Sequence, residues 1–393
     1  MKMWLCCAFV CSLVACQSSE EKWRSYHESA ETYLSNGQHV EAILQYRNAL
    51  KAKPKATESL RGLATAYRRT GEWIEALSVL DDLAVYAPED RLLVERARYA
   101  LAGEKAGLAR RHIYDQRVTR SDDLEALVVA AWLARNEARR ESAHQELFAG
   151  LKEGGTEALG VTGLPLGLEA RLALSTLDES LGRLDAARRQ LADLPAHPLV
   201  LLRNGELSAA SSEWDRARSE FDTAREAARA QESVKEVEHQ LFLSGQWRVA
   251  EVWRLSGSAF APYLTAEIAY RDGHPETAAT LLKPLLDHES VGDAARILCA
   301  RALRELERFD QAAEVLLPVD GGDESKMLLG LVLTDAGKPK EALPAFQALA
   351  KANPTKPDYA YYEGRAQSAL GDPEAAREAY ERALLAPGGH TNA

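Results

Sequence analysis

Residues 37–54 read GQHVEAILQYRNALKAKP, and residues 71–88 read GEWIEALSVLDDLAVYAP. The second segment begins 34 residues after the first and repeats its key positions: a glycine, an alanine, two packing residues and a terminal proline. These residues are Gly37, Ala42, Tyr46, Ala49 and Pro54, followed by Gly71, Ala76, Leu80, Leu83 and Pro88. A repeat of this length is typical of two-helix units that stack into an elongated array. The two segments therefore predict an all-α repeat protein.

The residues around these segments have the spacing of helices. From Trp23 onward, Tyr26, Ala30 and Tyr33 recur every three or four positions and so form one apolar face. Gly37 follows, where a helix end favours a left-handed residue, and Pro54 ends the next helix because proline lacks a backbone N–H. Each repeat is thus predicted to be a helical hairpin.

These residues resemble tetratricopeptide repeats, in which small residues at set positions let the two helices approach closely. The resemblance implies an α-solenoid, a right-handed superhelix whose concave groove holds other proteins. Counting along the chain predicts about eleven tetratricopeptide-like hairpins, clearest at the two ends, where Gly337 and Gly371 restore the 34-residue interval. The third unit is degenerate because Arg98 and Arg110 stand where small residues belong.

The helical repeat pattern also predicts how the chain is divided into segments. It predicts an N-terminal subarray over 23–152, a C-terminal subarray over 168–386 and a flexible tail over 387–393. Residues 153–167 contain five glycines and one proline, which is too many for a helix interior. This segment is either a hinge between the subarrays or an ordered inserted loop.

The N-terminus has a different pattern. Lys2 precedes a short apolar run, and Leu13-Val14-Ala15-Cys16 ends it, as in a secretory signal with a lipobox. This segment resembles the signals of bacterial lipoproteins, whose peptidase cuts before the cysteine that carries the acyl chains. We therefore expect a signal peptide over 1–15, lipidation at Cys16 and a short tether within 16–22; an ordinary signal peptide and a buried N-terminal helix are the alternatives. In that family Gln17, rather than aspartate, implies an outer-membrane, periplasm-facing location.

Net charge and cysteine content indicate which partners are not expected and what role the remaining cysteine has. The formal net charge is −11, so the chain repels phosphate and nucleic acid is not an expected partner. After cleavage, Cys299 is the single free thiol, and its apolar surroundings predict a buried structural residue.

No catalytic, cofactor or metal motif is recognisable. The sequence has no HExxH, paired CxxC, GxSxG or GxxxxGK[ST] pattern. His112, His144, His239 and His288 have no second histidine or cysteine three or four residues away, as a helical metal site would need. We therefore expect a protein that binds other proteins and is not an enzyme, although a site assembled across repeats would escape this reasoning.

The resemblance implies that inward-facing positions of each first helix line the groove. Arginine, tryptophan and tyrosine are enriched at binding hot spots, although exposed arginines and interhelix aromatics are also common in solenoids without such a role. Counted from the packing residues, the candidate contacts are Arg61, Arg68, Trp132, Arg135, Arg301, Arg304, Tyr361 and Arg365.

One specific binding mode is not expected. Chaperone adaptors of this class grip a C-terminal carboxylate with lysine and asparagine, whereas the matching positions here carry His27, Glu31, Arg61 and Thr65. Because Glu31 would repel a carboxylate, that mode is unfavourable in the first repeats.

The leading hypothesis is an outer-membrane lipoprotein that scaffolds a cell-envelope assembly through protein partners. The first two repeats resemble those of repeat lipoproteins from exosortase and exopolysaccharide systems, and also those of pilus-assembly and secretion systems. The alternative is an accessory subunit that tethers a peptidoglycan enzyme.

Overall fold

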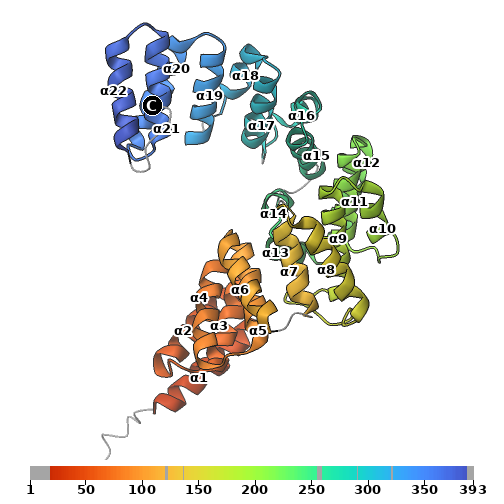
Figure 1. Ribbon diagram of the computed structural model, residues 1–393. Helices are drawn as coiled ribbons and strands as arrows, with labels where there is room; N and C mark the ends of the chain where they lie inside the picture. The colour runs from red at the N-terminus through yellow and green to blue at the C-terminus, as the bar shows by residue number, and fades with distance from the viewer. Residues whose placement is uncertain are drawn as a thin grey trace, which may run out of the picture. The chain divides into compact units, whose positions relative to one another are not determined.

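The computed structural model describes residues 18–119, 123–135, 137–254, 259–289, 291–319 and 322–386. These residues form 22 α-helices, the number that eleven helical hairpins require. The described part of the chain contains no strand, only one isolated bridge between Leu159 and Pro165. The predicted all-α solenoid is confirmed (Figure 1). The signal segment, Cys16 and the predicted tail lie outside the described residues.

Two compact units divide the chain. Unit 1 comprises the chain up to Asp193 together with Lys235–Ala250, and unit 2 comprises Leu194–Val234 and the chain from Glu251. The three boundaries fall after Asp193, after Val234, which is the first residue of α13 (Val234–Leu243), and within α14 (Trp247–Trp253). The other helices of unit 1 are α1 (Ser19–Ser35), α2 (His39–Ala52), α3 (Thr57–Thr70), α4 (Trp73–Tyr86), α5 (Asp90–Ala102), α6 (Ala106–Thr119), α7 (Leu124–Ala134), α8 (Arg140–Glu153), α9 (Leu166–Ser180) and α10 (Leu184–Leu191).

Unit 2 contains the remaining hairpins. Its helices are α11 (Pro198–Ala210), α12 (Trp214–Ala230), α15 (Phe260–Arg271), α16 (Pro275–Leu282), α17 (Gly292–Glu305), α18 (Phe309–Leu316), α19 (Asp323–Asp335), α20 (Pro339–Ala352), α21 (Pro357–Ala369) and α22 (Pro373–Leu385). Cys299 on α17 is 4% exposed, as its apolar surroundings predicted, and burial raises the pKa of its thiol.

The ends of the first helices follow from local chemistry. The Ser18 hydroxyl accepts from the backbone of Glu21, and the Glu21 carboxylate accepts from the backbone of Ser18, so a capping box starts α1 at Ser19. The first helix thus begins four residues before Trp23, within the segment predicted as a tether. Gly37 and Gly71 follow α1 and α3 with φ of 74° and 81°, the left-handed conformation that the sequence predicted.

Close helix packing depends on small residues. Ala30, Ala42 and Ala76 are fully buried. In unit 2, Gly330 on α19 lies so close to Phe346 on α20 that a Cβ atom there would stand 2.5 Å from the ring. Gly205 against Phe221 and Gly364 against Tyr380 show the same contact. The small positions thus let an aromatic ring of one helix lie directly on the backbone of the other.

The glycine-rich segment forms a loop between α8 and α9 within unit 1. Its backbone closes on itself through Gly160 N to Leu164 O at 2.9 Å, Leu166 N to Ala158 O at 2.8 Å and Gly167 N to Thr156 O at 2.8 Å. Outside the loop, Arg91 on α5 donates to the Leu159 carbonyl at 3.3 Å. The loop is therefore held both by its own hydrogen bonds and by α5.

Helix α13 returns to the N-terminal part of the chain. Its Glu236 pairs with Arg69 of α3 at 3.0 Å, and His239 lies edge-on to Trp73 of α4 with ring centroids 5.4 Å apart. Arg135, just after α7, donates to the Gly245 carbonyl at 2.7 Å. These contacts explain why Lys235–Ala250 belongs to unit 1.

Candidate functional site

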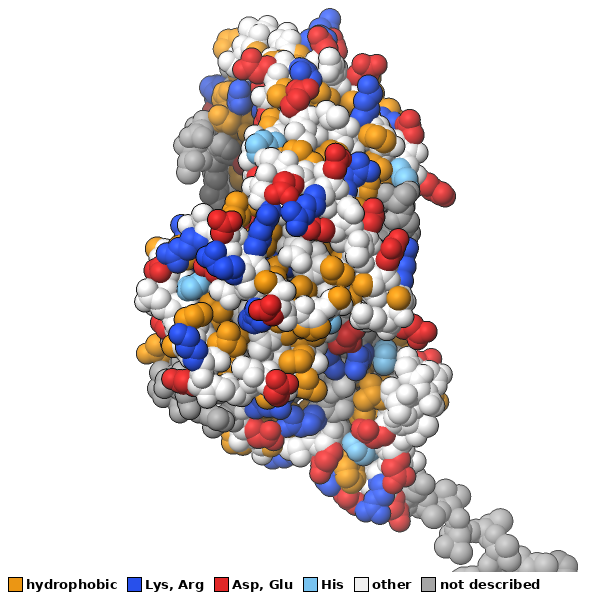
Figure 2. All heavy atoms as spheres, turned by 90° about the vertical axis from the view of Figure 1, so that its right-hand side faces the viewer, with side chains coloured by type: hydrophobic (Ala, Val, Ile, Leu, Met, Phe, Trp, Pro, Cys, Tyr) orange, Lys and Arg blue, Asp and Glu red, His pale blue; other side chains and the backbone are white. Residues whose placement is uncertain are grey.

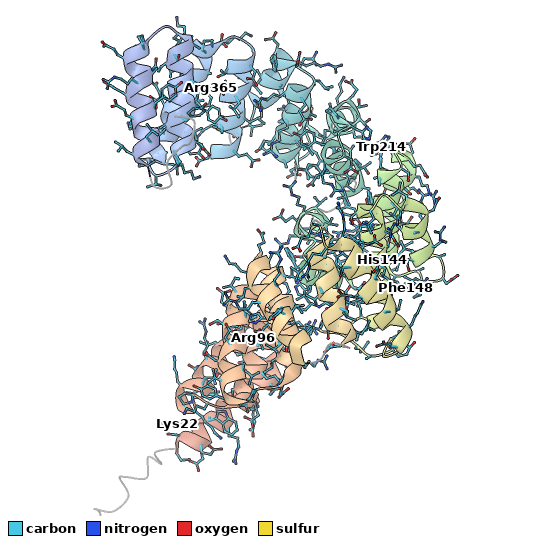
Figure 3. The ribbon with its side chains drawn as sticks, viewed as in Figure 1. Lys22, Arg96, His144, Phe148, Trp214 and Arg365 are labelled. Carbon is cyan, nitrogen blue, oxygen red and sulfur yellow. The ribbon has the colours of Figure 1, made fainter. Side chains whose placement is uncertain are left out.

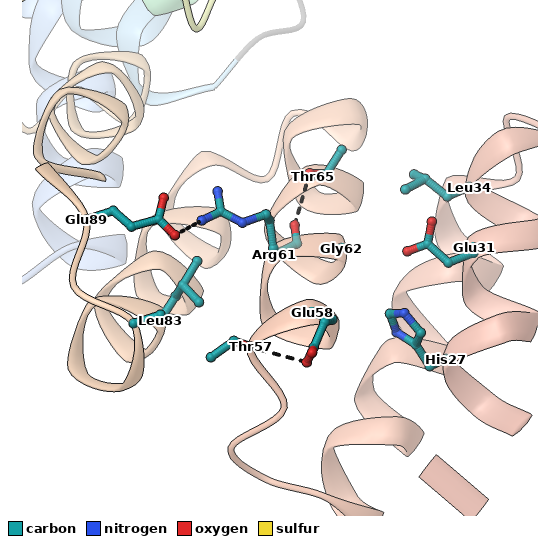
Figure 4. Close-up of a pocket in the computed structure, with 11 residues that line it drawn as sticks. His27, Glu31, Leu34, Thr57, Glu58, Arg61, Gly62, Thr65, Leu83 and Glu89 are labelled. Carbon is teal, nitrogen blue, oxygen red and sulfur yellow. Dashed lines mark hydrogen bonds and ion pairs between the residues drawn. The ribbon is translucent and has the colours of Figure 1, made fainter. Parts of the chain in front are cut away.

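A groove runs along the first helices of the first three hairpins in unit 1. Its first pocket has a volume of about 410 Å³ and is formed by α1, α3 and the end of α4. Figure 4 shows side chains of α1 and α3 facing each other across it. The lining residues are His27, Glu31, Leu34, Thr57, Glu58, Arg61, Gly62, Thr65, Leu83, Ala87 and Glu89.

The polar side chains on the α1 side of this pocket are held in place. Glu31 accepts a hydrogen bond from the Tyr46 hydroxyl, and burial together with this bond raises the pKa of Tyr46. The Ser59 hydroxyl lies 3.1 Å from the His27 Nδ1 atom and accepts from the Trp23 indole at 2.9 Å. The pocket therefore offers a polar surface with little side-chain freedom to lose on binding.

A second pocket of about 350 Å³ adjoins the first along α3 and α5. The two pockets share Arg61, Thr65 and Glu89. The second also contains Arg68, Arg91, Leu92, Glu95 and Tyr99, with Gly160 and Val161 of the loop. Burial raises the pKa of Glu95, which accepts from the Tyr99 hydroxyl at 3.2 Å. The groove thus continues from α1 to the glycine-rich loop.

The charges along the groove are mixed. Glu31, Glu58 and Glu89 line the first pocket beside Arg61, whereas Arg61, Arg68 and Arg91 line the second beside Glu89 and Glu95. Arg61 itself donates to Glu89 at 2.9 Å, and its side chain is 48% exposed. Figure 2 shows acidic and basic side chains interspersed over one face of the molecule as well.

The predicted contacts of the N-terminal subarray have three different surroundings. Arg61 and Arg68 line the second pocket of the groove, and their contact with a partner stays a prediction. Trp132 is only 5% exposed, because every residue of α7 is buried, so its side chain belongs to the interior of unit 1. Arg135 is half-buried and holds Gly245 of the α13–α14 turn. The sequence did not reveal this contact between Arg135 and the turn after α13.

In unit 2 the predicted arginines of α17 form ion pairs with the next hairpin, whereas Tyr361 and Arg365 make ring contacts within the α21–α22 hairpin. Arg301 pairs with Glu324, and Arg304 donates to Asp335 at 2.6 Å. Tyr361 packs against Tyr362 and Tyr380, with ring centroids 5.2 and 5.8 Å away. The exposed Arg365 lies over the Tyr362 ring, 5.5 Å from its centroid. The role of these residues in binding stays a prediction.

The first repeats bring together the four positions of the carboxylate-binding mode. His27, Glu31, Arg61 and Thr65 all line the first pocket. The groove geometry is therefore present, and the chemistry of the side chains differs from that of a carboxylate clamp. Glu31 points from α1 toward α3 in this pocket (Figure 4).

Within the described ranges, no group of three or more histidine, cysteine, aspartate or glutamate side chains is placed to hold a metal ion. His144 instead stacks on Phe148, with ring centroids 6.2 Å apart (Figure 3). In the same part of the chain, no helix combines the length and apolar character needed to cross a bilayer.

Comparison with known proteins agrees with the helical repeat. Residues 33–98 match one tetratricopeptide repeat model, and residues 263–318 and 327–390 match another. No curated protein matches the sequence.

Among solved structures, the chain is similar to a tetratricopeptide repeat protein from Parabacteroides merdae. The identity is 16%, the match covers 72% of this chain and 99% of that one, and the TM-score is 0.49. It is also similar to YrrB, described as a TPR protein with an unusual peptide-binding site, at 18% identity over 45% of this chain and 88% of that one, with a TM-score of 0.35. The family models by themselves identify tetratricopeptide repeats in residues 33–98, 263–318 and 327–390 of this chain.

Proposed function

We propose that this protein is a membrane-anchored scaffold that holds an extended segment of a partner protein along α1, α3 and α5 and so assembles a cell-envelope complex. The observation that carries the proposal is the continuity of the two pockets, which share Arg61, Thr65 and Glu89. A continuous groove suits a peptide chain better than a compact small molecule, which would occupy one enclosed cavity.

The chemistry of the groove fits the same occupant. An extended peptide carries backbone donors and acceptors together with side chains of either charge. The first pocket offers mainly carboxylates together with the apolar Leu34 and Leu83, and the second offers mainly guanidinium groups beside Glu89 and Glu95. Charges of both signs along one path favour a partner of defined sequence and register over a uniformly charged polymer.

The anchor and the compartment rest on the sequence alone. Leu13-Val14-Ala15-Cys16 supports lipidation at Cys16, and Gln17 supports the outer membrane. Ser18 already caps α1, so the groove-bearing repeats begin directly after the proposed anchor. A partner bound there would be held close to the membrane surface.

Site-specific photocrosslinking in cells of the native host tests the groove. A photoreactive residue at Thr65, which lines both pockets, is expected to form adducts with a partner. The control is the same residue at Val40 on α2, which is 70% exposed and lines neither pocket. No adduct at Thr65, or the same adducts at both positions, would contradict groove binding. Mass spectrometry of the adducts identifies the partner. Export, pilus or secretion components would support the assembly of an envelope complex, whereas peptidoglycan enzymes would support the alternative role of tethering such an enzyme.

A further inference from the structure

Arg98 on α5 is completely buried and lies where a repeat of this class would carry a small residue. Its Nη2 atom donates to the Glu169 carboxylate of α9 at 3.0 Å, and its Nε atom lies 3.7 Å from the Glu125 carboxylate of α7. Its Nη1 atom donates to the Leu243 carbonyl of α13 at 3.4 Å. One guanidinium thus joins four helices of unit 1.

The cluster holds two buried carboxyl groups for one cation. The side chains of Glu125 and Glu169 are 8% and 3% exposed. A Cβ atom on Gly160 would stand 2.8 Å from a Glu169 oxygen and 2.9 Å from a Glu125 oxygen, so both groups converge on the loop backbone. Two ionised carboxylates in a dry site repel each other, and a single guanidinium neutralises only one of them.

Burial raises the pKa of Glu169 to about 7. The nearby Glu125 charge acts in the same direction, whereas Arg98 and the Thr162 hydroxyl act against it. These groups come from α5, α7 and the loop, and α13 contributes the uncharged Leu243 carbonyl. The geometry and the charge count therefore both favour one bound proton near neutral pH.

The same cluster holds one wall of the groove. The Val161 N–H donates to Glu125 at 2.6 Å, in the loop whose Gly160 and Val161 line the second pocket. The loop backbone between these two residues rests on the carboxylates on one side and faces the groove on the other. A change in the charge of the cluster is thus transmitted to the groove through a direct contact.

We propose that the Arg98–Glu125–Glu169 cluster is a proton-dependent clasp that closes the glycine-rich loop against the groove at or below neutral pH and releases it at alkaline pH. This inference rests on the proposed role of the groove, because the clasp would make partner binding there sensitive to pH. Loss of the proton leaves an uncompensated negative charge beneath the loop, and water entering through a loosened loop stabilises that charge.

The direction of the pH effect follows from the coupling between proton binding and loop closure. A carboxyl whose pKa is higher in the closed state than in the open state favours closure while it is protonated. That contribution is full below the pKa of the open state and is lost as the pH rises through about 7. Ordinary salt-bridged carboxylates behave oppositely and lose their stabilisation in acid.

Hydrogen–deuterium exchange of loop residues 156–165 tests the clasp without needing a partner. In the full chain, the protection of these amides, corrected for intrinsic exchange, is expected to fall about tenfold between roughly pH 6 and pH 8, because a carboxyl with a pKa of about 7 in the closed state loses its proton over that range. Glu169→Gln, which stays neutral, is expected to remain protected at both pH values. Helix α21 in unit 2 is the internal control. Unchanged wild-type protection, or an equal loss in Glu169→Gln, would overturn the proposal.

A second measurement does not depend on the variant. Carbon-13 titration of the Glu169 carboxyl in the wild-type chain is expected to show ionisation near neutral pH, and ionisation in the range of ordinary carboxyl groups would overturn the proposal. Because neither measurement involves a partner, failure of the clasp is distinct from failure of groove binding, which the crosslinking experiment tests.

Discussion

Replacing Gly330 by alanine should destabilise the α19–α20 hairpin, although alanine is the better helix former. A Cβ atom at this position would lie 2.5, 2.6 and 3.1 Å from three carbons of the Phe346 ring. That ring is 1% exposed and stacks on Tyr362, with centroids 5.8 Å apart, so it cannot turn into solvent. Overpacking of this kind costs about 1–3 kcal/mol, whereas the change from glycine to alanine in a helix gains about 1 kcal/mol. The balance is a loss of roughly 1 kcal/mol.

Native-state hydrogen exchange measures the change in stability of the α19–α20 hairpin alone. Global melting of a repeat protein does not resolve a single hairpin. Amides of α19 and α20 should exchange about fivefold faster in Gly330→Ala. Gly107→Ala on α6 is the matched control, because no neighbouring side chain or distant backbone lies within 4 Å of the added Cβ atom. Its helix should exchange at the same rate or more slowly.

A double-mutant cycle identifies the clash as the cause. Phe346→Leu removes ring atoms that face Gly330, so the double variant should lose less stability than the sum of the two single variants. If Gly330→Ala were as favourable as Gly107→Ala, or if the cycle showed no coupling, the packing argument for the small positions would be refuted.

Three further predictions concern the anchor, the fold and the groove. Cys16→Ser should prevent acylation and release the protein from membranes; continued fractionation with the outer membrane would contradict the lipoprotein assignment. Ala42→Arg places a charge at a fully buried position and should cost more than about 3 kcal/mol, seen as lost helicity and a lower melting temperature in circular dichroism, whereas unchanged melting would refute the packing. Arg61→Glu should abolish crosslinking from Thr65, whereas Arg110→Glu should not, because both arginines are half-exposed and paired with a glutamate but only Arg61 lines the groove; equal effects would argue against a groove contact.

The repeat itself could be predicted because its determinants are local. Gly37 and Gly71 show the left-handed conformation inferred from their place after an apolar helix face, and Ala42 and Ala76 are fully buried. The start of α1 was also visible in principle, since Ser18 and Glu21 have the spacing of a capping box. The apolar period alone did not identify this start, because the residues before Trp23 are polar.

The interior of unit 1 could not be predicted, because its contacts join distant parts of the sequence. Arg98 looked like a departure from the repeat, and its partners Glu125 and Glu169 are 27 and 71 positions away. The ion pair between Arg69 and Glu236 spans 167 positions. A helical period carries information about the nearest hairpin and none about such pairings, so it did not reveal that Trp132 is buried.

The return of α13 to the N-terminal part has a consequence for how this array could change in length. A simple solenoid gains or loses a repeat at little cost, because each repeat contacts only its neighbours. Here Asp193 and Lys235 both belong to unit 1, and residues 194–234 of unit 2 connect them. Deleting a hairpin from that connection would pull Glu236 and His239 away from Arg69 and Trp73. The number of repeats before α13 is therefore constrained by contacts between helices that are not neighbours in the sequence.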